Sequence, residues 1–478
     1  MKKLSTDIAV ISAGTAGLSA TVTAAEGGAK VMTFEKRGIT GGTANHGSGI
    51  FGVESRLQKA KQYPLTKEEA FNIYMTFTHW RVNARLVKAL IDKSSESIAW
   101  LEGLGVKFFE IHSHGLGNYH TQHTVDAPEI GEKMQGRAMA MMTILAERAK
   151  ALNVPLYLKT RAEKLTKEGS RISGVIARNE DGEEIQVTTK AVILATGAYG
   201  GNFPMVFNSG DGMRMAKEIG AIIKEPSILP EPENKPPPQR PTGGGRRIGF
   251  SGLMFAFQQP ALVVNKLGER FMNEEIIMGS VFSQNPVMRQ PEQLAYIVFD
   301  EDTKNIYKKS FDVMPGGMQQ PYDKAPNFDE ELKEVMEAEP DRFIKADSLE
   351  ELCRKTGINI DGLKQTLDEY NTACDTGRDN AFCKKARYLR PVRQPPYYAT
   401  RQMARGDTDW VGIKVNYKTE VIGTDYKTIQ GLYAAGMEIA CELYHDTYPF
   451  ILPATAMGFA IHSGRIAAEN ALKYVGMK

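Results

Sequence analysis

The chain has 478 residues, with 59 Lys and Arg against 57 Asp and Glu, and a formal net charge of +2. This balance gives no electrostatic reason to expect nucleic acid or a charged membrane surface as a partner, and no apolar run is long enough to span a bilayer. The four cysteines are scattered without a C-x-x-C pair, which disfavours a haem or iron–sulfur cluster on the chain.

The N-terminal segment predicts a complete βαβ unit. Residues 7–11 are a short apolar run typical of a buried parallel strand, and residues 18–25 repeat apolar positions at helical spacing until Gly27. Residues 29–34 read as a second strand that ends at Glu35. Because the first strand begins almost at the N-terminus, we expect no secretory signal and a cytoplasmic protein.

The turn between this strand and helix is similar to the dinucleotide fingerprint G-x-G-x-x-G, but Ser12 replaces the first glycine. Gly14 lets the backbone approach a pyrophosphate, and Gly17 lets the helix and strand pack closely. Ser12 restricts the turn but keeps its backbone N–H, and Glu35 follows about twenty residues later, where an acidic side chain takes the ribose hydroxyls. An ordinary turn with chance glycines is the alternative. The agreement of strand, turn, helix, second strand and Glu35 favours a nucleotide-binding turn.

The following segments continue an α/β pattern. The glycine-rich stretch 41–50 directly follows the second strand, as loops that approach a ligand with their backbone do. Residues 66–104 and 136–153 have apolar positions at helical spacing, and residues 155–198 read as strands joined by hairpin turns.

A change of composition then marks a second region. Residues 226–247 are rich in proline and then glycine, which predicts a stiff, irregular connection or hinge. A mixed α+β segment follows, and the chain returns to strands and a final helix from about Gly458 to Ala471. This order predicts an α/β domain of residues 1–236 and 409–478, interrupted by an inserted α+β domain of residues 237–408.

Four histidines, His112, His114, His120 and His123, lie within a dozen residues and could ligate a metal. The stretch contains glycines and has no regular helical or strand spacing. We therefore predict a loop near the substrate entrance, and no metal site.

Seven segments along the chain share a pattern with one known family: "IAVISAGTAGLSA", "FEKRGITGGTANHGSGI", "GRAMAMM", "AVILATGAYGGN", "NSGDGMRMAKEIGA", "LVVNKLGERFMNE" and "GLYAAGMEIA…TAMGFAIHSGRIAAENA". Through them the chain resembles, nearly end to end, the FAD-binding family of fumarate reductase and succinate dehydrogenase flavoproteins. The resemblance implies a Rossmann-like FAD-binding domain with an inserted α+β capping domain, and FAD as the cofactor.

The resemblance also implies the positions that contact FAD. The pyrophosphate lies at the fingerprint turn, the adenosine ribose at Glu35, and the flavin ring near the last helix. The implied contacts are Ser12, Ala13, Gly14, Thr15, Ala16, Glu35, Lys36, Gly41, Gly42, Thr43, Ser48, Gly49, Ala162, Ala195, Thr196, Gly197, Asp211, Gly436, Met437, Ala454, Thr455 and Ala456.

Two of these positions depart from the family. Met437 stands where the family has a glutamate on the ribityl chain, and Glu438 follows it, which leaves that contact open. Gly42 stands where respiratory members attach the flavin through a histidine. We therefore expect FAD to be bound noncovalently.

Further departures concern the substrate. Met278 stands where the family has the arginine that donates a proton, and Ile451 stands where the family has the arginine that binds the substrate carboxylate. Burying a dicarboxylate without paired cations is costly, so we expect neither fumarate nor succinate as the substrate. Nearby aromatic residues suit a larger, less charged, aromatic substrate; they are Tyr444, His445, Tyr448 and Phe450, and Trp410 could join them.

We therefore predict an FAD-dependent oxidoreductase that reduces or forms a C=C bond conjugated to a carbonyl in a small-molecule, non-dicarboxylate substrate. Tyr444, His445 and Arg405 are the candidate catalytic residues, as proton donors. A ketosteroid-type dehydrogenase and an electron-transferring subunit without its own substrate are the alternatives. No second nucleotide fingerprint is present, so we expect electrons from another protein or from reduced free flavin.

Overall fold

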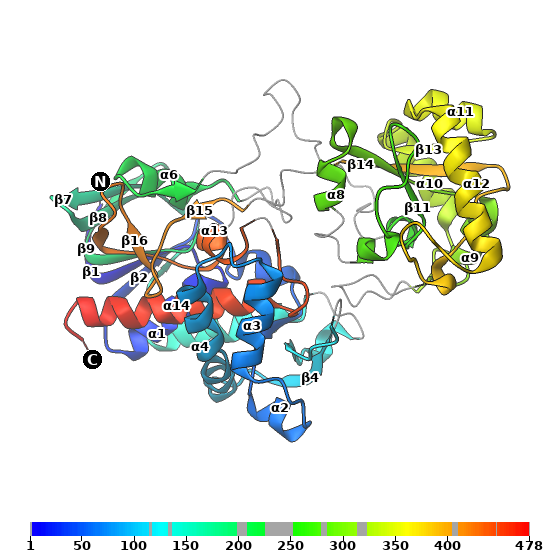
Figure 1. Ribbon diagram of the computed structural model, residues 1–478. Helices are drawn as coiled ribbons and strands as arrows, with labels where there is room; N and C mark the ends of the chain where they lie inside the picture. Colours follow the sequence, from blue (N-terminus) through cyan, green and yellow to red (C-terminus); the bar gives the residue numbers. More distant parts are fainter. Residues whose placement is uncertain are drawn as a thin grey trace. The chain divides into compact units, whose positions relative to one another are not determined.

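A computed structural model describes residues 2–113, 117–131, 136–197, 208–224, 252–278, 284–312, 323–403, 410–445 and 447–477 of the chain. The chain divides into two compact units, one of Met1–Leu229 with Gly406–Lys478 and one of Pro230–Arg405 (Figure 1). The domain boundaries expected from the sequence, and the proline-rich hinge, lie outside the described residues and stay predictions.

The first unit alternates strands and helices. Its elements are β1 (Lys2–Ile11), α1 (Thr15–Glu26), β2 (Val31–Phe34), η1 (Gly42–His46), β3 (Gly49–Phe51), α2 (Arg56–Ala60), α3 (Lys67–Phe77), α4 (Ala84–Gly103), β4 (Phe108–His112), β5 (Gln122–Val125), η2 (Pro128–Ile130), α5 (Ala138–Ala151), β6 (Leu156–Tyr157), β7 (Thr160–Glu168), β8 (Arg171–Asn179), β9 (Glu184–Leu194), α6 (Asp211–Glu218), β10 (Ile223–Lys224), β15 (Gly412–Ile413), β16 (Glu420–Ile422), β17 (Thr428–Ala434), η8 (Gly436–Ile439), α13 (Ala440–Leu443) and α14 (Thr455–Tyr474).

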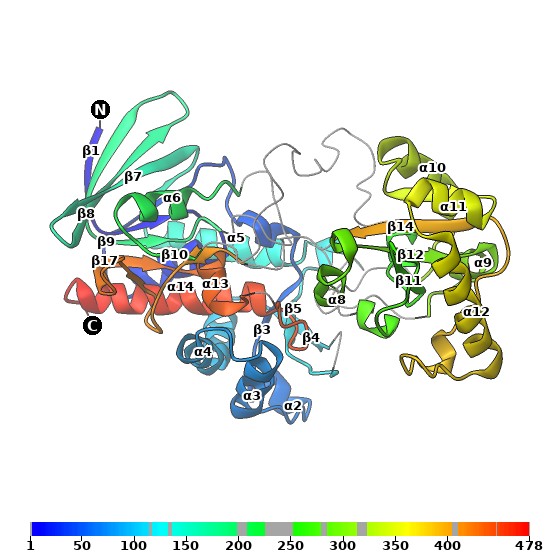
Figure 2. The same ribbon diagram turned by 45° about the horizontal axis from the view of Figure 1, so that its top comes forward.

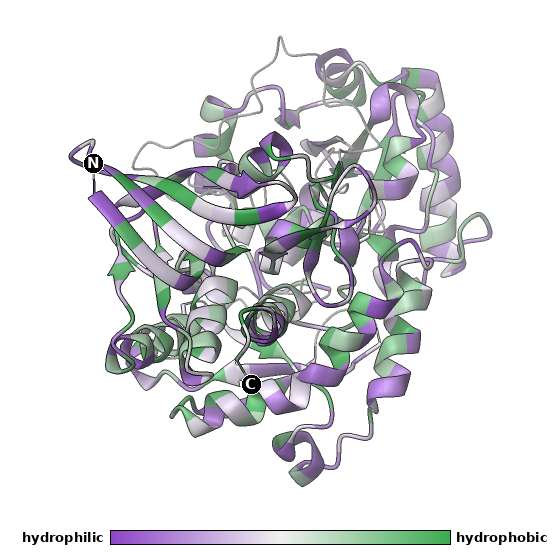
Figure 3. Cartoon of the chain, turned by 90° about the vertical axis from the view of Figure 1, so that its left-hand side faces the viewer, coloured by the Kyte–Doolittle hydropathy of each residue, from purple (hydrophilic) through white to green (hydrophobic). Residues whose placement is uncertain are grey.

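The main sheet of this unit has the order β16-β17-β8-β9-β1-β2-β6, with β7 paired to β8. Strand β1 lies parallel to both β2 and β9, as Rossmann-like topology requires. It begins at Lys2, five residues before the expected start, because residues 2–6 pair with the first half of β9. That half of β9 alternates buried and exposed side chains, and its last four residues are all buried. The strands near the N-terminus carry alternating hydrophilic and hydrophobic bands (Figure 3).

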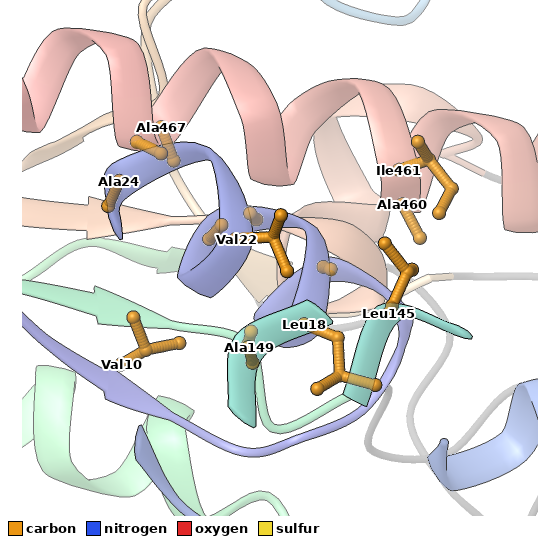
Figure 4. Close-up of a cluster of buried hydrophobic side chains, with 14 of the residues drawn as sticks. Val10, Leu18, Val22, Ala24, Leu145, Ala149, Ala460, Ile461 and Ala467 are labelled. Carbon is orange, nitrogen blue, oxygen red and sulfur yellow. The ribbon is translucent and has the colours of Figure 1, made fainter. Parts of the chain in front are cut away.

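Helices α1 and α14 pack side by side against this sheet (Figures 1 and 2). Small residues allow the approach, because a Cβ on Gly464 would lie 2.3 Å from the Ala16 carbonyl oxygen. Leu18 of α1 and Leu145 of α5 belong to the same buried cluster as Ile461 of α14 (Figure 4). Burial of a side chain such as Leu18 stabilises the fold by about 2 kcal/mol, so this packing fixes the helix that follows the fingerprint turn.

The second unit is built on a four-stranded antiparallel sheet of order β11-β12-β14-β13, with one apolar cluster containing Phe257 and Phe299 and another containing Val264 and Val298. Its elements are α7 (Gly252–Ala256), β11 (Leu262–Asn265), η4 (Glu274–Met278), α8 (Gln284–Met288), η5 (Pro291–Gln293), β12 (Leu294–Phe299), α9 (Glu301–Tyr307), α10 (Phe328–Ala338), β13 (Phe343–Ala346), α11 (Leu349–Thr356), α12 (Ile360–Thr376), η6 (Ala386–Tyr388) and β14 (Tyr397–Met403).

These features confirm the predicted fold class, a Rossmann-like α/β unit accompanied by an inserted α+β unit. The helices expected at residues 66–104 and 136–153 are α3, α4 and α5. Among the described residues, no helix is both long and apolar enough to cross a bilayer.

Candidate cofactor and active site

Glu35, at the end of β2, is the centre of the fingerprint region. Its Oε2 accepts hydrogen bonds from the Ala13 backbone N–H at 2.8 Å and from the Ser12 hydroxyl at 3.2 Å. Its Oε1 accepts the Arg37 backbone N–H at 2.8 Å. The parallel pairing of β1 with β2 therefore places the acidic side chain against the turn, as the fingerprint predicts.

Ser12 occupies the position of the missing first glycine with a φ of 94°. Side chains other than glycine rarely adopt this conformation, so the residue is strained. Its hydroxyl offsets part of that strain, because it accepts the Gly14 N–H at 3.1 Å as well as bonding to Glu35. Gly17 is required by packing, since a Cβ there would lie 1.9 Å from the Ser12 carbonyl oxygen.

The glycine-rich loop folds back onto this turn. The Gly41 N–H donates to the Ala13 carbonyl at 2.8 Å, and Gly14 and Gly41 form an isolated bridge. Gly42 has a positive φ, and a Cβ on it would lie 3.3 Å from the Gly14 Cα. Thr43 follows in η1. The structure thus brings the predicted residues of the two loops together, leaving backbone close to where a pyrophosphate would lie.

Lys36 and Asp211, two further predicted FAD contacts, form an ion pair with each other. Lys36 Nζ lies 2.8 Å from Asp211 Oδ2, and Arg161 forms a second ion pair with Asp211. Burial raises the pKa of Asp211, but hydrogen bonds from Lys36, Arg161 and Ser209 outweigh it, so the pKa is lowered. Lys36, Arg161 and Ser209 also line an open hollow beside Glu35. Arg37, whose backbone N–H binds Glu35, lines the same hollow, so the hollow adjoins two of the predicted cofactor contacts.

Glu438 is a candidate site residue whose contact the sequence left open. It is fully buried, and its Oε2 accepts both the backbone N–H and the hydroxyl of Thr196 at 2.6 Å. Its Oε1 has no hydrogen-bond partner among the described residues. Burial raises the pKa of this carboxyl to about 7, against hydrogen bonds from Thr196 that lower it. A buried carboxyl next to Met437 was the only signal in the sequence.

The same loop is held against the fingerprint helix. The Gly436 N–H donates to Ser463 Oγ at 2.8 Å, and a Cβ on Gly436 would lie 2.8 Å from that of Ala16. Gly197 has a positive φ, like Gly436. The carboxyl ends of β1, β9 and β17 therefore bring Ala16, Thr196, Gly197 and Gly436 to one edge of the sheet, where α/β folds bind their ligands.

Four predicted contacts have structural partners instead. The Ser48 hydroxyl accepts from Gln122 at 2.9 Å, and a Cβ on Gly49 would lie 2.2 Å from the His123 carbonyl oxygen. Ala162 pairs with Ala177 of β8, and the Ala195 N–H donates to the Ile11 carbonyl at 3.0 Å. Their roles toward FAD stay predictions.

The aromatic residues expected near the substrate form one cluster, which we define as Trp410, Tyr444, Tyr448 and Phe450. Ring centroids lie 5.4 Å apart for Trp410 and Tyr444, 4.9 Å for Tyr444 and Tyr448, and 4.7 Å for Tyr448 and Phe450. The Trp410 indole N–H and the Tyr444 hydroxyl make no hydrogen bond to any described residue. Burial raises the pKa of the Tyr444 hydroxyl well above the ordinary value.

This cluster meets the last helix at its start. Helix α14 begins at Thr455, three residues before the expected start, because Ala454 caps it with a φ of 66°. The Tyr448 hydroxyl accepts the Ala456 N–H at 3.0 Å and the Thr455 hydroxyl at 3.2 Å. Two predicted flavin contacts thus adjoin the aromatic cluster.

The remaining candidates divide between described and undescribed residues. The His445 backbone carbonyl accepts the Trp410 backbone N–H at 2.7 Å, which ties His445 to the cluster. Arg405 and the side chain of Met278 lie outside the described residues. The catalytic roles of Tyr444, His445 and Arg405 stay predictions.

The loop predicted for the histidines is wrong at two positions. His112 ends β4 and His123 lies in β5, which pairs with both β3 and β4. His123 is buried, with Nε2 2.6 Å from the Ser55 hydroxyl, and burial lowers its pKa to about 4. His120 stacks on Tyr63, and His114 lies outside the described residues. No cluster of metal ligands occurs in the described part of the chain.

Comparisons with known proteins match this geometry. Residues 7–450 match the family model of the FAD binding domain. A vinyl phenol reductase of Lactiplantibacillus plantarum is 30% identical, over 98% of this chain and 96% of its own.

Two solved structures share the fold. The open conformation of a flavocytochrome c3 fumarate reductase is 24% identical with a TM-score of 0.64, over 99% of this chain and 79% of that one. A 3-ketosteroid-delta4-(5alpha)-dehydrogenase from Rhodococcus jostii RHA1 is 20% identical with a TM-score of 0.71, over 98% of this chain and 97% of that one.

The family match indicates FAD as the cofactor, which is consistent with noncovalent binding. The crowded fingerprint glycines, the hollow beside Glu35 and the unpartnered Glu438 oxygen fit such a dinucleotide. The chain therefore belongs to the FAD-binding family of fumarate reductase and succinate dehydrogenase flavoproteins.

Proposed function

We propose that this FAD-dependent oxidoreductase reduces a carbon–carbon double bond conjugated to an aromatic ring, with para-vinylphenol as a representative substrate. The observation that carries the proposal is the aromatic cluster at the start of α14, built from rings and hydroxyls. A neutral aromatic alkene can stack in such surroundings, whereas a dicarboxylate needs paired cations. The vinyl phenol reductase that matches over nearly the full length supports the same substrate class.

The chain's own residues would hold the cofactor in a defined orientation. The fingerprint turn and Gly41–Gly42 would receive the pyrophosphate, and Glu35 would take the adenosine ribose, with Lys36 beside it. Thr196 and Glu438 would face the ribityl chain, and the first turn of α14 would face the flavin ring. Reduced FAD supplies hydride to one carbon of the double bond.

Fumarate is disfavoured by the sequence of the same segment. Residues 447–456 contain no Lys or Arg, and Ile451 stands at the position of the family's clamping arginine. Removing two carboxylates from water without charged partners costs several kcal/mol per ion.

We also propose that electrons reach the flavin from reduced free flavin or from an electron-donor protein, and that the protein acts in the cytoplasm. No disulfide joins the four cysteines, which suits a reducing compartment.

Product analysis tests this proposal. Purified protein is incubated without oxygen with dithionite-reduced free flavin as the electron donor. Para-vinylphenol, fumarate, acrylate and a 3-ketosteroid enone are each tested in a separate reaction. We expect para-ethylphenol to form and succinate to be absent. Rapid succinate formation, or turnover of the ketosteroid alone, would replace this proposal with a dicarboxylate or ketosteroid enzyme.

A further inference from the structure

The Tyr448 hydroxyl has hydrogen-bond partners unlike those of its neighbours. Its oxygen accepts two hydrogen bonds, from the Ala456 N–H at 3.0 Å and from the Thr455 hydroxyl at 3.2 Å. Both donors belong to the first turn of α14, a helix of 20 residues. With two bonds accepted, the oxygen still carries its own proton.

That proton has no acceptor among the described residues. Tyr74, packed in the same region, donates its hydroxyl proton to the Leu443 carbonyl at 2.7 Å. The Tyr444 hydroxyl neither donates nor accepts within the described residues, and its side chain is completely buried. Tyr448 keeps 7% of its surface exposed. Of these three tyrosines, it alone combines a free proton with an oxygen that is already stabilised.

The surroundings also favour the phenolate that would remain after the proton leaves. A hydrogen bond donated to an ionised oxygen stabilises it, and the positive end of a helix dipole adds to this effect. Burial raises the pKa of Tyr448, and the bonds from Thr455 and Ala456 lower it. The group is therefore protonated near neutral pH. Burial holds the pKa values of the nearby Tyr444 and Tyr74 hydroxyls well above the ordinary value.

We propose that Tyr448 is the catalytic acid that protonates the second carbon of the reduced double bond. The inference rests on the proposed function. The π electron pair of the alkene forms a C–H bond with the Tyr448 proton at one carbon, and the other carbon, left electron-poor, would receive hydride from reduced FAD. Water then returns a proton to the phenolate. The net change is addition of two hydrogens, with dithionite or reduced free flavin restoring the reduced cofactor.

For a para-hydroxyl styrene the direction of addition follows from the substrate. Electron release from the phenol makes the terminal carbon the nucleophilic one, so this carbon receives the proton and the benzylic carbon receives the hydride. The substrate phenol loses its proton to water as its terminal carbon is protonated, and it regains a proton from water once the benzylic carbon has received the hydride.

The test compares Tyr448→Phe with Tyr74→Phe, which removes a buried tyrosine hydroxyl of the same cluster region. Each FAD-loaded protein is reduced, mixed anaerobically with para-vinylphenol, and followed by flavin absorbance. Flavin content and the spectral change on binding para-ethylphenol to the oxidised protein are measured as well. We expect Tyr448→Phe to keep its flavin, to bind para-ethylphenol within about threefold of wild type, and to reoxidise about 100-fold or more slowly. Tyr74→Phe should reoxidise at the wild-type rate.

A wild-type reoxidation rate in Tyr448→Phe would overturn the role of Tyr448 and leave the proposed function intact. Failure of the wild-type protein to react with para-vinylphenol would instead overturn the proposed function.

A second variant decides the matter if Tyr448→Phe does not fold. Thr455→Val removes one hydrogen bond from the Tyr448 oxygen, which raises the Tyr448 pKa. The alkaline limb of the reoxidation rate should therefore move to higher pH, whereas a limb caused by the substrate phenol would stay in place. An unmoved limb would exclude Tyr448 as the acid.

Discussion

The fingerprint region and the aromatic cluster belong to the same unit but treat buried polar groups differently. Around Glu35, both carboxylate oxygens and the Ser12 hydroxyl are engaged by named partners. In the aromatic cluster, the Trp410 indole N–H and the Tyr444 hydroxyl are left without partners among the described residues, and the Tyr448 proton has no described acceptor. The first region is hydrogen-bonded within the protein, and we propose that a bound substrate completes the second.

The difference separates what the family shares from what this chain has changed. The fingerprint region accommodates Ser12 at a positive φ because the Ser12 hydroxyl makes hydrogen bonds that offset part of the backbone strain. We propose that the rings and hydroxyls of the aromatic cluster stand where the family has charged groups. Buried polar groups without hydrogen bonds cost stability, which a functional role would explain. Glu438 differs from Glu35, since its Oε1 has no hydrogen-bond partner among the described residues.

The largest expected effect is therefore a pH dependence caused by Glu438. Its folded-state pKa of about 7 lies above the ordinary value of 4.5, so the stability it contributes is complete below pH 4.5 and is lost as the pH rises through 7. At about 1.4 kcal/mol per pKa unit, the loss is about 3 kcal/mol.

Thermal unfolding of FAD-depleted protein is measured from pH 5 to pH 8. This range covers most of the window and ends about one unit above the folded-state pKa of Glu438. Glu438→Gln should abolish most of the slope. The same slope in both proteins would assign it to other groups.

The second-largest effect is expected from Glu35, which accepts three hydrogen bonds in the fingerprint region, and it should appear as weaker FAD binding. Glu35→Ala removes a charge-assisted contact of about 1.5–3 kcal/mol, which weakens FAD binding about 10- to 100-fold. Ser12→Gly relieves the positive φ but loses two hydrogen bonds, so we expect a change of about fivefold or less in either direction.

Fluorescence titration of FAD into depleted protein measures both affinities. Glu180→Ala, which removes an exposed carboxylate from the rim of the same hollow, serves as the control. Equal losses for Glu35→Ala and Ser12→Gly would contradict the central role of Glu35.

The smallest effect distinguishes, by its sign, an unpartnered hydroxyl of the aromatic cluster from a partnered hydroxyl beside it. Tyr444→Phe removes a buried hydroxyl without a described partner and should raise the free energy of unfolding by about 1 kcal/mol. Tyr74→Phe breaks a bond to the Leu443 carbonyl and should lower it by about 1 kcal/mol. Urea unfolding compares the two variants. Destabilisation by Tyr444→Phe as large as that by Tyr74→Phe would show that the Tyr444 hydroxyl is satisfied.

Local patterns predicted the fold and half of the site. The βαβ unit could be read from the sequence because strand, turn and helix depend on residues within a few positions of each other. Glu35 could be placed by its spacing from the glycines.

The contacts missed by the sequence depend on tertiary structure. Glu438 reaches Thr196 across 242 residues, and Lys36 pairs with Asp211 across 175 residues. No periodicity carries such information. His112 and His123 were placed in a loop because their strands are short and become recognisable only through pairing with β3. The early start of α14 depends on the positive φ of Ala454, which its sequence does not favour.

The most direct test of the account is a single-turnover comparison on one preparation. Protein with its FAD fully reduced is mixed without oxygen with para-vinylphenol in one experiment and with fumarate in another. Flavin reoxidation is followed in both. The account predicts that para-vinylphenol reoxidises the flavin with formation of para-ethylphenol, and that fumarate leaves it reduced over the same time. Reoxidation by fumarate as fast as by para-vinylphenol would contradict the claim that the aromatic cluster has replaced the family's dicarboxylate site.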